Sequence, residues 1–189
     1  YNPFTHEWEM QPLVSKGKDN LKNFQELSFV TNNNVSLTQT GKYGSFRTSL
    51  THVYNKGQWP NDKLNKLTYT ASGKMKWKNF SSEAGLTYNK RFYPNMGGTG
   101  YGGSGYLYNL LVWSGTEFDI RDYKDYWIKK GELSNWMDRT WYENPYLIAN
   151  EITSSNDYNV LNGFLNLTYD FTSWLKLTLR SGADYYSSK

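Results

Sequence analysis

The sequence predicts an all-β protein whose strands pair as antiparallel hairpins. Aromatic residues make up 18% of the 189-residue chain, with 17 Tyr and 8 Trp, yet the mean hydropathy is −0.78. Many large rings in a polar chain are typical of strands with one wet face, because aromatic and β-branched side chains suit a half-buried pleated surface. Apolar and polar residues also alternate over several long stretches, which is the period of a strand. These stretches come in pairs that are separated by only a few residues, as in hairpins.

The first predicted hairpin turns within residues 40–45 (TGKYGS). The strand before the turn has a weak pattern that rests on Val35 and Leu37. The strand after it carries Phe46, Leu50 and Tyr54 at even positions. We therefore expect two antiparallel strands here, the first less well defined than the second.

The second predicted hairpin has the clearest pattern. Between residues 67 and 77 the odd positions are apolar or small, whereas the even positions are Thr, Ser and Lys. Residues 80–90 repeat the alternation, with Phe80, Leu86 and Tyr88 on one face. Only two residues, Lys78 and Asn79, separate the two stretches, which indicates a tight turn.

A third hairpin is predicted at the C-terminal end of the chain. Apolar residues alternate with polar ones from Leu161 to Tyr169 and again from Leu175 to Tyr185. The short stretch 171–173 connects them. The polar faces of the hairpins are expected to lie together on one side of the sheet. Their residues are Thr68, Thr70, Ser72, Lys74, Glu83, Thr87, Asn162, Asn166, Lys176 and Arg180.

Loop lengths indicate the class of β-protein. The turns near residues 42, 78 and 172 are tight, whereas the connections at 56–63 and at 91–157 are long. The second of these has about 65 residues, while an ordinary hairpin loop has 2–5 residues. All tight turns then fall at one end of the sheet and all long loops at the other. That polarity is typical of outer-membrane β-barrels, which have short periplasmic turns and long outer loops.

Aromatic residues near the strand ends favour the same class. The rings near the tight turns are Trp77, Phe80 and Phe171, and those near the opposite strand ends are Tyr54, Tyr88 and Tyr185. Two such girdles mark the interfaces of a membrane barrel. A soluble β-sandwich alternates in the same way, so alternation alone does not decide between the two, but strand length, loop asymmetry and the girdles favour the barrel. No apolar stretch reaches the roughly 20 residues of a transmembrane helix.

Composition excludes some functions. The net charge is +4, and the basic residues are too scattered to form a nucleic-acid-binding patch. The chain has no cysteine, which removes disulfides and thiolate metal sites. It opens without Met or a basic leader segment, so we expect a mature or internal piece of a longer protein.

The glycine-rich stretch 97–106 matches the nucleotide-binding pattern G-x-G-x-x-G at 98–103. A phosphate cradle needs a βαβ unit, and antiparallel hairpins do not provide one. We therefore expect a flexible outer loop in which glycine permits positive φ, with the start of a short helix in the residues after it.

The remaining candidates for chemistry are weak. Asp119, Asp122 and Asp125 recur every third residue, but they lack the spacing of a calcium loop and are expected to form a solvated face. His6 and His52 are far apart in the sequence, and a glycosidase pair of Glu83 and Glu143 has no support from their positions. We predict no catalytic, cofactor-binding or metal-binding residues, and no enzymatic activity.

Aromatic residues in the long loops form the last candidate group. Most are expected to form a small core that keeps the long connection ordered, while one or two contact a substrate or a covering lid, since sugars stack on rings. The group comprises Trp59, Trp113, Trp127, Trp136, Trp141 and Tyr142.

Three stretches of the sequence resemble one protein family. They are residues 46–77, 107–127 and 141–187, about half of the chain, and the most specific part is the order NPY, WLKL and RSGADYY between residues 144 and 186. They resemble the SusC/RagA family of TonB-linked outer-membrane transporters of Bacteroidota. The resemblance implies a barrel of about 22 strands with an N-terminal plug, driven by TonB and covered by a SusD-like surface lipoprotein. It also implies import of glycans or peptides.

Six strands are roughly a quarter of such a barrel. We therefore expect residues 1–189 to form part of a TonB-dependent receptor barrel, with residues 91–157 as a long extracellular loop and with the plug and remaining strands outside this chain. The resemblance places the protein in the cell outer membrane. The implied partners are a SusD-like lipoprotein, TonB through the plug, and lipid or lipopolysaccharide, and no nucleic acid.

Two other functions remain open at this point. The barrel can instead serve as a structural subunit of an outer-membrane assembly or secretion complex, with loops that dock proteins. The chain can also be a soluble β-sandwich that binds carbohydrate, a class that needs no detergent.

Overall fold

The computed structural model describes residues 1–95, 105–138 and 140–189. The chain divides into two compact units, each assembled from three separate segments. Unit 1 comprises Tyr1–Phe29, Lys56–Lys63 and Pro94–Ser155. Unit 2 comprises Val30–Asn55, Leu64–Tyr93 and Asn156–Lys189.

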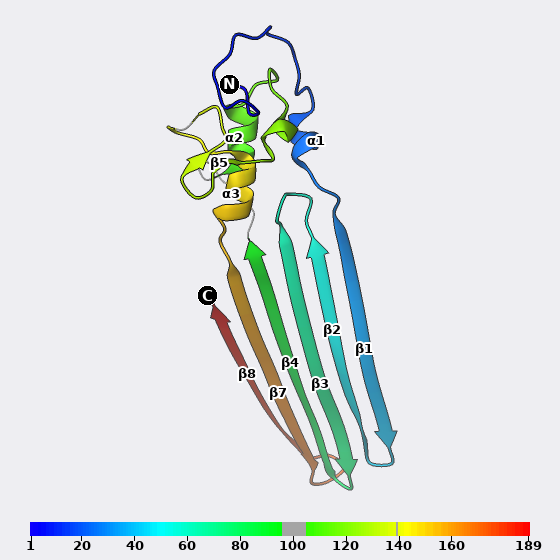
Figure 1. The fold of residues 1–189 in the computed structure, drawn as a ribbon. Helices are drawn as coiled ribbons and strands as arrows, with labels where there is room; N and C mark the ends of the chain where they lie inside the picture. Colours follow the sequence, from blue (N-terminus) through cyan, green and yellow to red (C-terminus); the bar gives the residue numbers. More distant parts are fainter. Residues whose placement is uncertain (96–104, 139) are drawn as a thin grey trace. The chain divides into compact units, whose positions relative to one another are not determined.

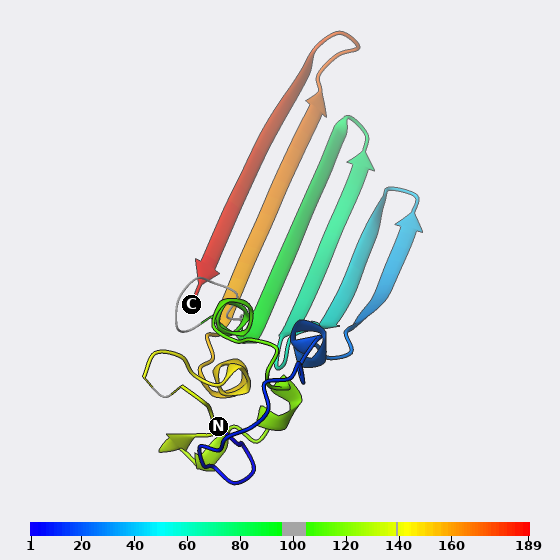
Figure 2. The same ribbon diagram turned by 90° about the horizontal axis from the view of Figure 1, so that it is seen from above.

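Unit 2 is one antiparallel sheet of six strands in the order β1-β2-β3-β4-β7-β8 (Figure 1). The strands lie side by side in this order when the sheet is viewed from above (Figure 2). Their bounds are β1 Phe29–Gly41, β2 Gly44–Lys56, β3 Lys63–Trp77, β4 Phe80–Asn95, β7 Asn156–Asp170 and β8 Lys176–Ser188.

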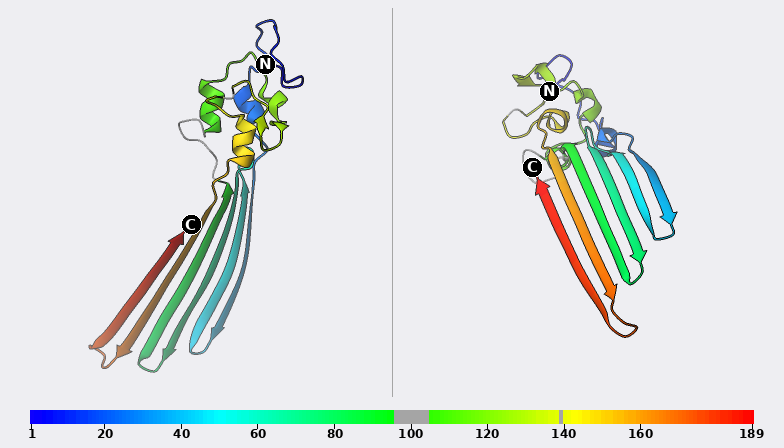
Figure 3. Two further views of the ribbon diagram at one scale, coloured as in Figure 1. Left: turned by 60° about the vertical axis from the view of Figure 1, so that its left-hand side comes forward. Right: turned by 90° about the horizontal axis from the view of Figure 1, so that it is seen from below.

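The three predicted hairpins are confirmed: β1–β2, β3–β4 and β7–β8 are joined by short connections at the same end of the sheet (Figure 3). The β3–β4 turn has only Lys78 and Asn79 between its strands, and Lys78 has φ +52°. A left-handed backbone is uncommon for a residue with a side chain, and it is tolerated in tight turns. The Lys78 ammonium lies 4.8 Å from the centre of the Trp77 ring.

The bounds of the third hairpin and of the long connection differ from the prediction. Residues 171–175 form the β7–β8 turn, and the amides of Phe171 and Thr172 both donate to the carbonyl of Leu175, at 3.0 and 3.2 Å. Leu175 therefore belongs to the turn. The long connection is shorter than the predicted 91–157, because β4 and β7 stay paired as far as Tyr93 and Asn156.

The sheet does not close on itself. Within the described residues, each of the outer strands β1 and β8 pairs on one side only. The antiparallel all-β architecture of unit 2 is therefore as predicted, and closure into a barrel remains a prediction.

Unit 1 contains short helices and a two-stranded ribbon around an aromatic core. The core is centred on Phe24, Tyr106, Tyr123, Trp136 and Tyr146. No helix in the described ranges is both long and apolar enough to cross a membrane. The elements are α1 Asn20–Phe24, α2 Tyr106–Val112, the 3₁₀ helix η1 Ile120–Tyr123, β5 Trp127–Lys129, β6 Leu133–Ser134 and α3 Pro145–Glu151.

Candidate functional site: the two faces of the sheet and the aromatic core of unit 1

One face of the sheet is predominantly apolar across β4, β7 and β8. Continuous antiparallel pairing aligns the side chains of these strands in rows. The five rows nearest the tight turns contain only two serines among aliphatic, aromatic and small residues. From the turns outward, the rows are Phe80–Tyr169–Leu177, Ser82–Leu167–Leu179, Ala84–Leu165–Ser181, Leu86–Gly163–Ala183 and Tyr88–Leu161–Tyr185.

The length of this apolar band can be compared with that of the band which outer-membrane β-barrels turn toward lipid. Nine residues of β7 from Leu161 to Tyr169 span about 27 Å along the strand, or about 21 Å after a strand tilt of about 40°. The expected apolar band of such a barrel is about 25 Å. Rings occupy both ends of the band, with Phe80 and Tyr169 at one end and Tyr88 and Tyr185 at the other.

The apolar band ends abruptly at the row beyond Tyr88. The Tyr88 hydroxyl donates to Oδ1 of Asn159 at 2.8 Å, so the ring lies in the band while its polar tip points out of it. Lys90, in the same row as Asn159, forms an ion pair with Asp157 at 3.1 Å. Tyrosines at an interface between apolar and polar surroundings adopt this arrangement, with the ring among apolar groups and the hydroxyl among polar ones.

The opposite face carries polar side chains that hydrogen-bond between strands. Asn162 Nδ2 donates to the Asp184 carboxylate, and the hydroxyls of Thr168 and Thr178 are 3.3 Å apart. Two rows lie between these pairs on the same face, and one of them holds Glu83, Asn166 and Arg180. The predicted polar residues of β4, β7 and β8 therefore share one face of the sheet.

One apolar ring on the polar face was missed by sequence reasoning. Phe164 is paired with Gly85, and a Cβ on Gly85 would lie 2.3 Å from the Phe164 ring atom Cε1. Gly85 thus leaves the space in which the ring covers the backbone of the neighbouring strand. The pairing joins strands that are distant in sequence, so neither local pattern reveals it.

The loop aromatics divide into core residues and exposed residues. Trp136 is 2% exposed, and its ring centre lies 4.9 Å from that of Tyr123. Trp59 packs against the same core next to Phe24 and Tyr106. These two tryptophans have the structural role that was expected for most of the group.

The other loop aromatics lie nearer to solvent. Trp113 and Tyr142 stack with their ring centres 4.6 Å apart and their planes at 21°, and Trp113 is 51% exposed. Trp141 is 75% exposed. Trp127 is half-buried, and its indole Nε1 donates to Glu151 at 3.4 Å. Trp113 and Trp141 thus have the most surface available for a ligand or a partner.

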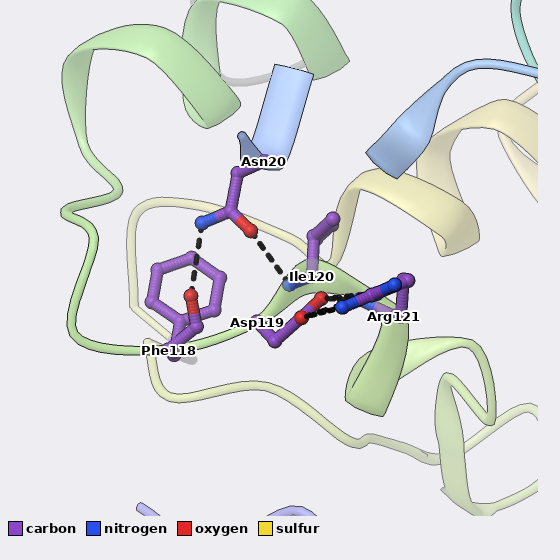
Figure 4. Close-up of polar contacts among 5 residues, drawn as sticks. All are labelled: Asn20, Phe118, Asp119, Ile120 and Arg121. Atoms are coloured by element: carbon purple, nitrogen blue, oxygen red, sulfur yellow. Dashed lines mark hydrogen bonds and ion pairs between the residues drawn. The ribbon is translucent and has the colours of Figure 1, made fainter. Parts of the chain in front are cut away.

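Asp119 departs from the predicted solvated face. It is buried, and its carboxylate caps η1 by accepting from the amide of Arg121 at 2.9 Å and from the guanidinium of the same residue (Figure 4). The Arg121 hydrogen bonds hold the pKa of Asp119 below its usual value. The pKa of the nearby Asp122 is raised because its carboxylate is partly shielded from water and because the Asp119 charge is close. Asp122 and Asp125 are exposed, as expected.

The structure does not bring the other sequence-derived candidates together within one unit. His6 lies in unit 1 and His52 in unit 2, and Glu143 and Glu83 are divided in the same way. Among the described residues, no three His, Cys, Asp or Glu side chains are grouped to hold a metal ion. The pattern at 98–103 lies outside the described residues, whereas the helix expected after it is present as α2.

Buried asparagines hold unit 1 together, and sequence reasoning missed them. Asn20 donates to the carbonyl of Phe118 and accepts from the amide of Ile120, both at 2.9 Å (Figure 4). Asn95 donates to the carbonyl of Ala149, and Asn135 donates to that of Asp125. Such bonds satisfy the carbonyls of irregular backbone that would otherwise be buried without a partner.

Asn144 is the most connected of these asparagines. Its Nδ2 donates to the carbonyls of Tyr123 at 2.9 Å and Asn135 at 3.0 Å, while its Oδ1 accepts from the amide of Tyr146 at 2.8 Å. It is the N-cap of α3, and Pro145 follows at the first helical position. The Asn-Pro pair was the available signal, because both residues are favoured at those positions of a helix start.

Comparison with models of known protein families and with curated proteins gives no match to this chain.

Proposed function

We propose that this chain is part of the β-barrel of a SusC-like TonB-dependent transporter, which imports glycans or peptides across the outer membrane together with a SusD-like lipoprotein. The observation that carries the proposal is the register of β4, β7 and β8. It gathers an apolar band with rings at both ends on one face and hydrogen-bonded polar residues on the other. That division suits a wall between lipid and a polar lumen.

The exposure of the apolar band supports a lipid environment. Leu177, Leu179 and Tyr185 are each at least 60% exposed in the described chain. Apolar surface of this extent is normally shielded from water. Lipid shields it in a membrane β-barrel, whereas a second sheet shields it in a β-sandwich. Within its described residues, unit 2 consists of one sheet only, which favours lipid.

The free edges of the sheet support a larger assembly. An open edge leaves backbone amides and carbonyls without partners, and lipid does not satisfy them. In the proposed transporter, further strands pair with β1 and β8 and close the barrel. The polar face then lines the lumen or packs against the plug, which TonB displaces.

Unit 1 supplies the outer loops in this proposal. Its segments are the ones that connect β2 to β3 and β4 to β7, together with the segment that precedes β1. The exposed Trp113 and Trp141 and the stacked Tyr142 are the proposed contacts to substrate or to the lipoprotein lid. Large rings at an interface provide contact area at a small cost in conformational entropy.

A matched pair of arginine substitutions tests the proposal. Leu165 lies at the middle of the apolar band, and the adjacent Asn166 lies on the polar face between Glu83 and Arg180. An arginine on the lipid side at mid-depth costs about 2–4 kcal/mol, whereas lumen positions tolerate charge. We expect Leu165→Arg to lower the amount of folded intact protein in the outer membrane strongly, and Asn166→Arg to lower it little.

The measurement is the heat-modifiable, folded fraction of the intact protein on gels after membrane fractionation. Equal loss in the two variants would contradict the assignment of faces. Folded intact protein in the detergent-free soluble fraction would contradict the membrane proposal as a whole and would favour a soluble carbohydrate-binding protein.

A further inference from the structure

Unit 1 contains a cavity of about 410 Å³ to which the proposed transport function assigns no role. Its walls come from the N-terminal segment 1–16, from residues in and before η1 and from Met137, all of which belong to unit 1. The volume falls within the range of sites for small ligands or single side chains. Rings and carboxylates together dominate its lining.

Three of the aromatic rings that line the cavity contact one another. The Tyr1 ring stacks on the buried Tyr123 ring at 6.5 Å, and the Tyr123 hydroxyl donates to the carbonyl of Tyr1 at 3.3 Å. The Trp8 ring meets Tyr1 edge-on at 5.7 Å. Trp8 and Phe4 are 73% and 72% exposed, so their rings remain accessible to a ligand.

The charged groups of the cavity are mostly acidic. Glu9, Glu117 and Asp122 line it, with Lys16 as the one basic residue among its lining. Over the described ranges, no cationic nitrogen lies within 4.0 Å of any of these three carboxylates. The Lys16 ammonium donates to the side-chain carbonyl of Gln11. Three carboxylates therefore line the cavity against one lysine side chain, in a chain whose net charge is +4.

One of the carboxylates is fixed by neighbouring side chains. Oε1 of Glu9 accepts from the hydroxyl of Thr5 at 2.7 Å and from the amide of Asn2 at 2.9 Å. Hydrogen bonds to the ionised form keep the pKa of Glu9 below its usual value, with the Thr5 bond as the largest contribution. An ionised, positioned carboxylate beside accessible rings is the arrangement that recognises an organic cation.

We propose that this cavity binds a guanidinium or ammonium group on an aliphatic stem, as the Arg or Lys side chains of a peptide present it. The cation lies over a ring face and is paired by the carboxylates, while its stem packs against Leu13 and Met137. A neutral sugar would stack on Trp8 equally well but would gain nothing from the carboxylates. The inference rests on unit 1 alone, so it does not depend on the membrane proposal.

The test compares two probes that differ in charge but hardly in shape. Isothermal titration of the intact protein with Nα-acetyl-arginine amide should give binding, and the citrulline analogue, which lacks the positive charge, should bind at least several-fold more weakly. Trp8→Ala and Glu117→Gln should each weaken arginine-amide binding by about 2- to 5-fold, the range for one exposed cation–ring or ion-pair contact.

Asp125→Asn is the matched control, because Asp125 is an exposed acid of unit 1 that does not line the cavity. It should leave the affinity for arginine amide unchanged. Equal binding of the two probes would overturn the proposal, and so would the absence of arginine-amide binding at millimolar concentration. Unchanged affinity in both Trp8→Ala and Glu117→Gln would place the bound cation elsewhere.

Discussion

Replacement of Asn144 should open unit 1 locally. The side chain is fully buried and makes three hydrogen bonds, two as a donor to the carbonyls of Tyr123 and Asn135 and one as an acceptor from the amide of Tyr146. Asn144→Ala removes all three and leaves two carbonyls and one amide without their partner. No other residue connects α3, η1 and the segment after β6 in this way within the described residues.

The size of the effect follows from the groups that lose partners. Loss of a helix N-cap costs about 1 kcal/mol, and each buried carbonyl left unsatisfied costs about 1–3 kcal/mol. The free energy of local opening should therefore fall by about 3 kcal/mol or more. Amide hydrogens that exchange through that opening should exchange roughly 100-fold faster.

This fall in the free energy of local opening can be measured by hydrogen exchange of the intact protein. Mass spectrometry then gives the exchange rates of peptides that cover α3 and η1. Asn150→Ala is the control in the same helix, because Asn150 is exposed and makes one bond to the carbonyl of Tyr146. It should change the local stability by no more than about 0.5 kcal/mol.

Asn144→Asp separates the two roles of the side chain. Aspartate keeps a side-chain oxygen that can accept from the backbone amide of Tyr146. Its second oxygen replaces the Asn144 Nδ2 group, so the hydrogen bonds to the two carbonyls are lost. If the links to the carbonyls matter most, Asn144→Asp should resemble Asn144→Ala. Wild-type exchange rates in Asn144→Ala, or full rescue by Asn144→Asp, would refute the reasoning.

Two further predictions concern the sheet and the pH dependence of unit 1. Gly85→Val should displace the Phe164 ring and lower the stability of the sheet by about 1–3 kcal/mol in urea titrations of the folded fraction. Gly182→Ala should have little effect, since its Cβ meets only a carbonyl at 3.5 Å, and equal losses would show that the ring is not the cause. Because Arg121 lowers the pKa of Asp119 in the folded state, the stability that Asp119 contributes should be present above the ordinary pKa of an aspartate and lost as the pH falls through the lowered value. Asp119→Asn should therefore flatten the acid side of a pH–stability profile followed by protease resistance of unit 1, and an unchanged profile would contradict the role of the ion pair.

The hairpins could be predicted because their information is local. The alternation on either side of Lys78 and Asn79 fixes two strands and the turn between them without reference to the rest of the chain. The pairing of β4 with β7 is different, since it sets Gly85 against Phe164 across a long connection. Neither strand's own pattern contains that register, although the alternation within β7 alone places Phe164 on the same face as Asn162 and Asn166.

The interior of unit 1 was the least predictable part. The Asn-Pro pair signals that Asn144 begins a helix, but no pattern in the sequence shows that the fold buries Asn20 and Asn144 and uses their amides to satisfy backbone carbonyls. Asp119 was likewise expected in solvent and is buried next to Arg121. Burial of a polar side chain depends on which backbone groups approach it in space, and sequence periodicity does not report that.

The long connection between β4 and β7 has a consequence for the order of folding. These strands pair over their length, although about 60 residues of chain lie between Asn95 and Asn156. Closing a flexible loop of that length costs about 3–4 kcal/mol of chain entropy, which must be met before the first pairs between the strands form. A unit 1 that folds early would shorten the effective loop and remove much of this barrier. Each hairpin can form within microseconds by itself. The pairing of β4 with β7 is therefore the slow step in forming the sheet, and until it occurs the unpaired strand edges can pair incorrectly.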